Sequence, residues 1–120
     1  MFCFVLDEPK IRKNQAGPVY RTLTQGYNAT FRCEVESGHP KPEITWYFGW
    51  TDKLKKVDPI YDPRFTHPTE ETWLITGVET QDAGKYRCIA SNKAGEDSLR
   101  FEIRDVYGKL LHLKFNYNVY

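Results

Sequence analysis

Apolar and polar side chains alternate along four segments of the chain. A period of two residues is typical of strands that bury one face and expose the other. The apolar members are Ala29, Phe31, Cys33 and Val35; Ile44, Trp46 and Phe48; Tyr86, Cys88 and Ala90; and Leu99, Phe101 and Ile103. Pro40 and Pro42 precede the second segment, and the run Asn92-Lys93-Ala94-Gly95 follows the third, as turn signals. The pattern therefore predicts four half-buried β-strands around one core.

Two cysteines and one tryptophan occupy predicted inward positions. Cys33 and Cys88 belong to the first and third of these strands, and Trp46 belongs to the second. Two strands can therefore face each other across a core and close over a single indole ring. This arrangement predicts an all-β domain built as a sandwich of two sheets.

A longer set of residues carries a resemblance to a known family. Its members are Trp73, Ile75, Val78, Asp82, Gly84, Tyr86, Cys88, Ala90, Asn92 and Gly95. The set resembles the signature of the intermediate set (I-set) of immunoglobulin domains, and the resemblance covers about residues 9–104. It implies a two-sheet antiparallel immunoglobulin-like sandwich with Greek-key connections. It also implies that Cys33 and Cys88 form a disulfide or face each other in the core.

The resemblance gives internal roles to a core frame made of Trp46, Trp73, Asp82, Gly84 and Tyr86. Tyr86 would form a tyrosine corner, with its hydroxyl donated to main chain near Asp82 and its ring packed inside the sandwich. We also expect Arg64 to pair with Asp82 across one end of the sandwich. These residues would serve the fold rather than a binding partner.

Two positions depart from the family pattern. Trp73 stands where the family usually carries leucine, so we expect smaller neighbours, or a loop from Gly49 to Arg64 that folds over the larger ring. Trp50 lies where such domains commonly have a short charged turn. An exposed indole there would anchor a partner, whereas packing against Leu54 or Tyr61 would make Trp50 structural. Trp50 and Tyr61 are therefore the candidate partner contacts.

The two ends of the chain lie outside the resemblance. We expect residues 1–8 to lead into a domain spanning 9–104, and residues 105–120 to form a C-terminal extension. Within the extension, apolar residues alternate strictly at Leu111, Leu113, Phe115, Tyr117 and Val119. This pattern predicts either a linker or an extra edge strand, which would pair within the chain or support self-association by β-augmentation.

Length, composition and charge fit a single small domain. The chain has 120 residues, of which 40% are hydrophobic and 15% aromatic, enough to fill one core. Its formal net charge is +1, which argues against binding to nucleic acid or to anionic lipid. No apolar segment is long enough to cross a bilayer, so we expect no membrane insertion.

The chain carries no residue pattern that would support catalysis. His39, His67 and His112 are scattered without metal-ligand spacing, and neither a CxxC nor an HExxH motif occurs. No glycine-rich phosphate-binding loop follows a predicted strand. We therefore expect no enzyme activity, no metal site and no cofactor.

Two sequence features point to opposite compartments. Cys3 has no partner in the core frame and favours the reducing cytosol slightly, because a free thiol in a secreted protein risks intermolecular pairing. Asn28-Ala29-Thr30 matches a glycosylation sequon, so Asn28 would carry a sugar if the chain were secreted. The two features nearly cancel.

Residues 36–47 and 90–96 resemble I-set domains of giant muscle proteins of the titin, twitchin and obscurin type. This resemblance implies a non-catalytic module for protein–protein interaction and mechanical support in a large muscle or cytoskeletal protein. Its partners would be neighbouring immunoglobulin or fibronectin-type modules or filament proteins, in the cytoplasm at the sarcomere or cytoskeleton. The alternative is an extracellular cell-adhesion or receptor immunoglobulin domain, because adhesion molecules use the same set.

Overall fold

The computed structural model describes residues 5–14, 17–49, 54–56 and 63–108. The strands in these ranges are β1 (Asp7–Ile11), β2 (Val19–Thr24), β3 (Ala29–Arg32), β4 (Val35–His39), β5 (Glu43–Gly49), β6 (Lys55–Lys56), β7 (Phe65–Thr66), β8 (Thr72–Ile75), β9 (Gly84–Asn92) and β10 (Gly95–Tyr107). One turn of 3₁₀ helix, η1 (Thr80–Asp82), lies between β8 and β9. The predicted all-β class is confirmed.

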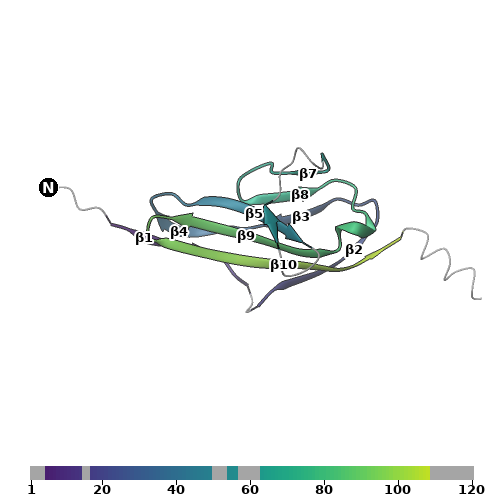
Figure 1. The fold of residues 1–120 in the computed structure, drawn as a ribbon, viewed down its shortest axis with the longest axis horizontal. Helices are drawn as coiled ribbons and strands as arrows, with labels where there is room; N and C mark the ends of the chain where they lie inside the picture. Colours follow the sequence, from purple (N-terminus) through teal and green to yellow (C-terminus); the bar gives the residue numbers. More distant parts are fainter. Residues whose placement is uncertain (1–4, 15–16, 50–53, 57–62, 109–120) are drawn as a thin grey trace, which may run out of the picture.

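The strands form the two layers of a sandwich (Figure 1). One layer is a five-stranded sheet with the order β2-β10-β9-β5-β6. The other contains the three-stranded sheet β3-β8-β7 and the pair β1-β4, where β4 follows closely after β3 along the chain. A disulfide between Cys33 and Cys88 joins the layers, with 6.4 Å between the two Cα atoms. The predicted immunoglobulin-like sandwich is therefore confirmed.

The N-terminal part of the chain contributes one strand to each layer. β1 pairs with β4 in antiparallel fashion, whereas β2 pairs in parallel with β10, so that Val19 lies opposite Phe101. The antiparallel sandwich that the resemblance implies therefore has one parallel pairing at this edge, because β2 and β10 run in the same direction. Alternation did not predict β2, since none of its side chains is fully buried.

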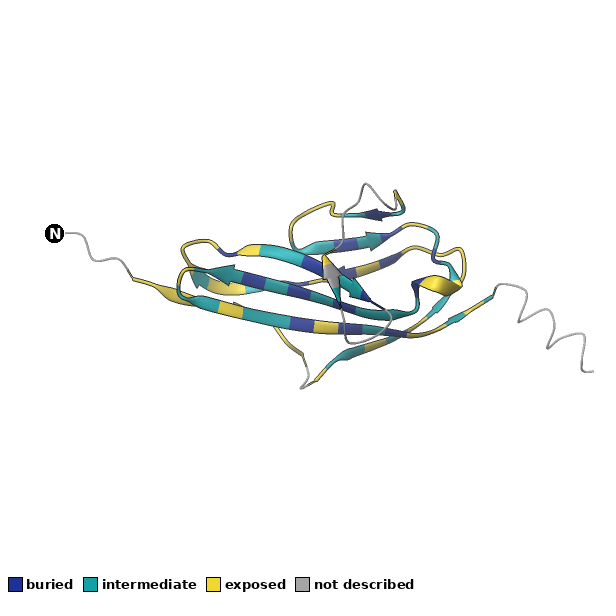
Figure 2. Ribbon diagram, in the orientation of Figure 1, coloured by how far each residue is buried: buried dark blue, intermediate teal, exposed yellow. Residues whose placement is uncertain are grey.

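The inward residues that alternation predicts do line the core. All those of the third and fourth predicted strands are buried, and Figure 2 shows the alternation of buried and less buried residues along β9 and β10. In the first two strands, Val35, Ile44 and Phe48 are half-buried and pack against the core. Full burial of each large apolar side chain contributes roughly 1.5–3 kcal/mol, which makes this core the main favourable contribution to folding.

Trp73 is fully buried, but its neighbours are large rather than small. The ring centroids of Trp46 and Phe65 lie 5.8 Å and 5.3 Å from that of Trp73, and the His67 ring lies edge-on at 4.7 Å. The expectation of smaller neighbours is wrong, because stacked and tilted rings fill the space that aliphatic side chains would occupy. The alternative, a loop folded over Trp73, falls mostly outside the described residues.

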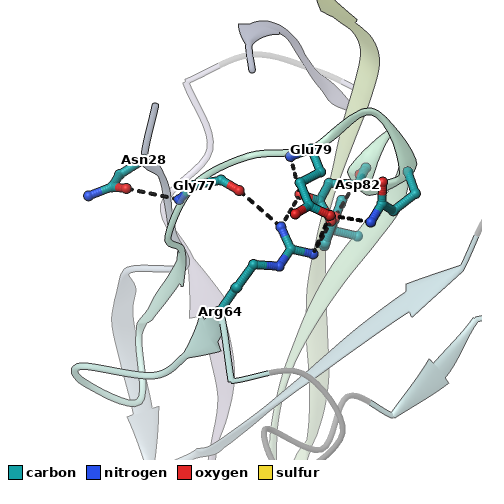
Figure 3. Close-up of polar contacts among 7 residues, drawn as sticks. Asn28, Arg64, Gly77, Glu79 and Asp82 are labelled. Carbon is teal, nitrogen blue, oxygen red and sulfur yellow. Dashed lines mark hydrogen bonds and ion pairs between the residues drawn. The ribbon is translucent and has the colours of Figure 1, made fainter. Parts of the chain in front are cut away.

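The end of the sandwich beside η1 is held by the predicted tyrosine corner. The Tyr86 hydroxyl donates to the carbonyl oxygen of Asp82 at 2.7 Å. The buried Asp82 carboxylate accepts two hydrogen bonds from Arg64, at 2.8 and 2.9 Å, and a third from the Glu79 backbone N–H at 2.7 Å (Figure 3). The expected pairing of Arg64 with Asp82 is thus present as a two-point contact, the geometry that makes such pairs strong.

Gly84 follows this corner at the start of β9, where the backbone passes close to β5. A Cβ atom at position 84 would lie 2.9 Å from a Phe48 ring carbon and 3.0 Å from the Gly49 carbonyl oxygen, and φ is +154°. Both the close approach and the backbone angle favour glycine.

The first and last strands extend beyond the expected domain limits at residues 9 and 104. β1 begins at Asp7 rather than at residue 9, and β10 continues beyond Arg104 to Tyr107. The extra residues of β10 are ordered by pairing, with Asp105 opposite Thr22 and Tyr107 opposite Thr24. The extra strand expected from the alternation at 111–119 lies outside the described residues.

Asp97 on β10 fixes the point where the chain leaves β1. Its carboxylate accepts hydrogen bonds from the Ile11 backbone N–H at 2.9 Å, from Lys13 Nζ at 2.6 Å and from the Ser98 backbone N–H at 2.9 Å. Partial burial by itself raises the pKa of Asp97, but these hydrogen bonds and the Lys13 charge outweigh it and lower the pKa below its usual value.

Replacement of Tyr86 by Phe should lower the free energy of unfolding by about 1–2 kcal/mol, because the Asp82 carbonyl loses its buried donor. Urea unfolding at neutral pH measures the change. Tyr107→Phe is the matched control, since Tyr107 is 46% exposed, and should change stability by less than about 0.5 kcal/mol. Equal effects of the two substitutions would contradict a structural role for the Tyr86 hydroxyl.

Replacement of Asp97 by Asn should flatten the acid limb of the stability curve. Because the pKa of Asp97 is lower in the folded chain than in the unfolded chain, its stabilising effect is present above about pH 4 and is lost as pH falls through the lowered value. Wild type should therefore exceed Asp97→Asn in stability at pH 7 and approach it near pH 2. Thermal unfolding at several pH values measures this, and a constant difference would argue against the ion pair.

Candidate protein-binding face

The outward side of the five-stranded sheet gathers charged and aromatic residues from four strands. Cross-strand register aligns them in rows: Lys56, Tyr47, Arg87 and Arg100 form one row over β6, β5, β9 and β10. We call this row the basic ladder. Arg87 is at its centre, on the middle strand of the sheet.

Arg87 and Arg100 lie directly opposite each other on β9 and β10. Neither guanidinium forms an ion pair with an acidic residue in the described part of the chain, and the Arg87 Nε atom is buried without a hydrogen-bond partner. Like charges directly opposite in a sheet are destabilising, and a buried donor without an acceptor adds to the cost. The pair therefore carries a local cost to stability.

A concavity of about 450 Å³ lies over the same part of the face. Lys85, Arg87, Arg100 and Glu102 are among the residues that line it, together with Pro18, Tyr20 and Leu54. Lys85 and Glu102 are opposite each other, so their charges offset. The positive charge that is left over therefore comes from Arg87 and Arg100.

Tyr20 forms an aromatic border of this concavity. It lies on β2 opposite Glu102 and is 45% exposed. The Arg104 guanidinium carbon lies 3.6 Å from the centroid of the Tyr20 ring, a cation–π contact that holds the ring in place. The site thus combines unpaired cations with an apolar margin, which is the composition of many protein-recognition surfaces.

The outward side of the three-stranded sheet carries the predicted sequon. Asn28 is exposed just before β3, and its Oδ1 accepts the Gly77 backbone N–H at 3.0 Å, which directs the amide nitrogen away from Gly77 (Figure 3). Thr30 is also exposed, on β3. A sugar on Asn28 would therefore project from this layer and leave the basic ladder open.

Some of the predicted site residues are internal, and others lie outside the described residues. Cys33, Cys88, Trp46, Trp73, Asp82 and Tyr86 are buried, and Gly84 is half-buried at the corner beside them. They have structural surroundings and do not form a binding site. Trp50 and Tyr61, the candidate partner contacts, lie outside the described residues.

Sequence reasoning missed the Arg87–Arg100 pair, although a signal was present. The predicted hairpin turn puts Asn92 opposite Gly95, and the Asn92 Oδ1 atom accepts the backbone N–H groups of Ala94 and Gly95 at 2.8 and 3.2 Å. Counting back along both strands from this turn brings Arg87 opposite Arg100. Alternation places both residues on the outward side, but only the register shows that they are neighbours.

Comparison with known proteins decides the family. Residues 8–92 match the family described as immunoglobulin domain. The chain belongs to the immunoglobulin-domain family. Among solved structures, this immunoglobulin domain is similar to the N-terminal eight Ig domains of Down Syndrome Cell Adhesion Molecule, with a TM-score of 0.71, 22% identity, and coverage of 86% of this chain and 13% of that one. The structure of neural ectodermal development factor IMP-L2 gives a TM-score of 0.70 at 23% identity, over 91% of this chain and 48% of that one.

Curated relatives of this immunoglobulin domain are larger proteins. Human junctional adhesion molecule C is 35% identical over 95 residues, which cover 74% of this chain and 30% of that protein. Mouse protein sidekick-2 is 36% identical over 81 residues, which cover 68% of this chain and 4% of that protein. The chain thus spans less than a third of these relatives.

No group of three or more His, Cys, Asp or Glu residues in the described ranges is arranged to hold a metal ion. Over the same ranges, no helix has the length and apolar character needed to span a membrane.

Replacement of Arg100 by Gln should raise stability by about 0.5 kcal/mol at low ionic strength, because it relieves the repulsion from Arg87. The gain should shrink in salt of about 1 M, where surface charges are screened. Arg32→Gln is the control, since Arg32 is exposed on the other layer opposite Thr72. Urea unfolding at two salt concentrations measures both variants, and a loss of stability in Arg100→Gln would reveal an attractive partner for Arg100.

Proposed function

We propose that this immunoglobulin domain is a non-catalytic recognition module of an extracellular cell-adhesion or receptor protein. The observation that carries the proposal is the 35% identity to human junctional adhesion molecule C over most of the chain. The name of that protein describes adhesion, and names of similar kind recur among the solved structures. The domain would bind other proteins and contribute no chemistry of its own.

The disulfide supports the extracellular location. The Cys33 and Cys88 sulfur atoms are bonded at the centre of the core, and both residues are fully buried. Disulfides persist in oxidising compartments and are rare in the cytosol. The exposed Asn28 and Thr30 of the sequon agree with the same location, because glycosylation requires an accessible asparagine in a secreted chain.

The outward side of the five-stranded sheet is the face best suited to binding. It carries the unpaired basic ladder and the concavity bordered by Tyr20. A sugar on Asn28 would occupy the opposite side of the sandwich, so glycosylation and binding would not compete. Trp50 and Tyr61 stay candidate partner contacts in this proposal.

The muscle-scaffold hypothesis is less well supported. The fold suits a filament module and a cell-surface module equally, since both use the same buried core. The similar proteins favour the cell surface, as their names include junctional adhesion molecule C and Down Syndrome Cell Adhesion Molecule. We therefore prefer the extracellular alternative, and we keep the I-set assignment as part of the proposal.

Mass spectrometry of the native protein tests the proposed location. We expect a glycan on Asn28 that is removed by a peptide N-glycosidase, and we expect Cys33 and Cys88 to resist alkylation until a reductant is added. Asn28→Gln and Thr30→Ala, expressed in the same cells, should each abolish the mass shift. Free thiols at both cysteines together with an unmodified Asn28 would instead support a cytosolic module.

A further inference from the structure

We infer that the binding face recognises an acidic side chain on a different protein, held between Arg87 and Arg100. This inference rests on the proposed function and specifies the chemistry of the partner. It begins from Arg87 and Arg100, which lie opposite each other on β9 and β10 and form no ion pair with an acid in the described part of the chain. A carboxylate placed between them would relieve their repulsion and supply an acceptor for the buried Arg87 Nε.

The surroundings of the pair restrict the partner to a protein segment. Tyr20 and Leu54 give the concavity apolar borders, and Glu102 contributes a negative charge to it. A long polyanion, such as a sulfated glycan, would meet Glu102 and would need a longer row of cations. An Asp or Glu beside an apolar residue satisfies both features, with the carboxylate on the arginines and the apolar side chain against Tyr20 or Leu54.

The position of the pair also argues against a second copy of this chain. In a symmetric dimer the same patch faces itself, and residues near the two-fold axis meet their own counterparts. Arg87 lies on the central strand of the sheet, so a symmetric contact through the middle of the face would bring four guanidinium groups together. Such like-charge juxtaposition is unfavourable, and the face is therefore suited to an unlike, acidic partner.

A phage-displayed library of random twelve-residue peptides tests this chemistry without knowledge of the natural partner. The probe proteins are wild type, the double variant Arg87→Gln/Arg100→Gln, and Arg32→Gln as the matched loss of charge on the other layer. We expect peptides selected on wild type to be enriched in an Asp or Glu next to an apolar residue. The best of these should bind the double variant at least about tenfold more weakly and Arg32→Gln unchanged.

The conservative variant Arg87→Lys/Arg100→Lys separates charge from geometry. It keeps both positive charges but cannot form the two-point contacts of guanidinium, so we expect peptide affinity between those of wild type and the double Gln variant. Circular dichroism and thermal unfolding of every variant confirm that loss of binding does not reflect loss of the fold.

Several results would overturn the inference. The first is any failure of the phage-display prediction: the selected peptides lack acidic residues, no peptide is selected, or the double Gln variant binds them as well as wild type does. A second is sedimentation equilibrium showing a wild-type dimer that Arg87→Gln/Arg100→Gln dissociates, which would make the occupant a second copy. A third is retention on immobilised heparin above physiological salt that the same variant abolishes, which would indicate a sulfated glycan. None of these results changes the outcome of mass spectrometry on Asn28, Cys33 and Cys88. The proposed extracellular location is therefore tested independently of the partner chemistry.

Discussion

The disulfide between Cys33 and Cys88 is the constraint on which the arrangement of this domain depends. It links β9 to the segment between β3 and β4, so it sets the distance between the two layers at the centre of the core. A crosslink over a loop of this length stabilises a fold by about 4 kcal/mol in the chain-entropy description, a substantial share of the net stability of a small domain. Trp46, Trp73 and Phe101 fill the space that the layer separation leaves.

Because the core and the corner at Asp82 stabilise the fold, the outward residues of β9 and β10 do not need to stabilise it. Two of the rows that cross β10 and β9 illustrate this freedom: the pair of Lys85 with Glu102 offsets its charges, whereas the pair of Arg87 with Arg100 does not. Proteins tolerate such locally unfavourable pairs where binding uses them, and the stability comes from elsewhere in the structure. A conflict between local energetics and the fold is therefore informative about function.

Much of the fold was predictable from the sequence, because its strongest signals are local. Alternation identified the inward residues of four strands, and the resemblance identified the corner of Tyr86 and Asp82. β2 could not be found this way, since its side chains are only partly covered and its strand is held by pairing with β10. The surroundings of Trp73 also escaped prediction, because Phe65 and His67 reach it from a segment with no periodic pattern.

The parallel pairing of β2 with β10 has a mechanical consequence. The six paired positions of β2 run from Val19 to Thr24 in the same direction as β10. A force that pulls the N-terminal end of β2 away from the C-terminal end of β10 acts along the strands, so the hydrogen bonds between them are loaded together in shear rather than opened one after another. Tension applied between these two strand ends is therefore resisted by all the hydrogen bonds of this edge together.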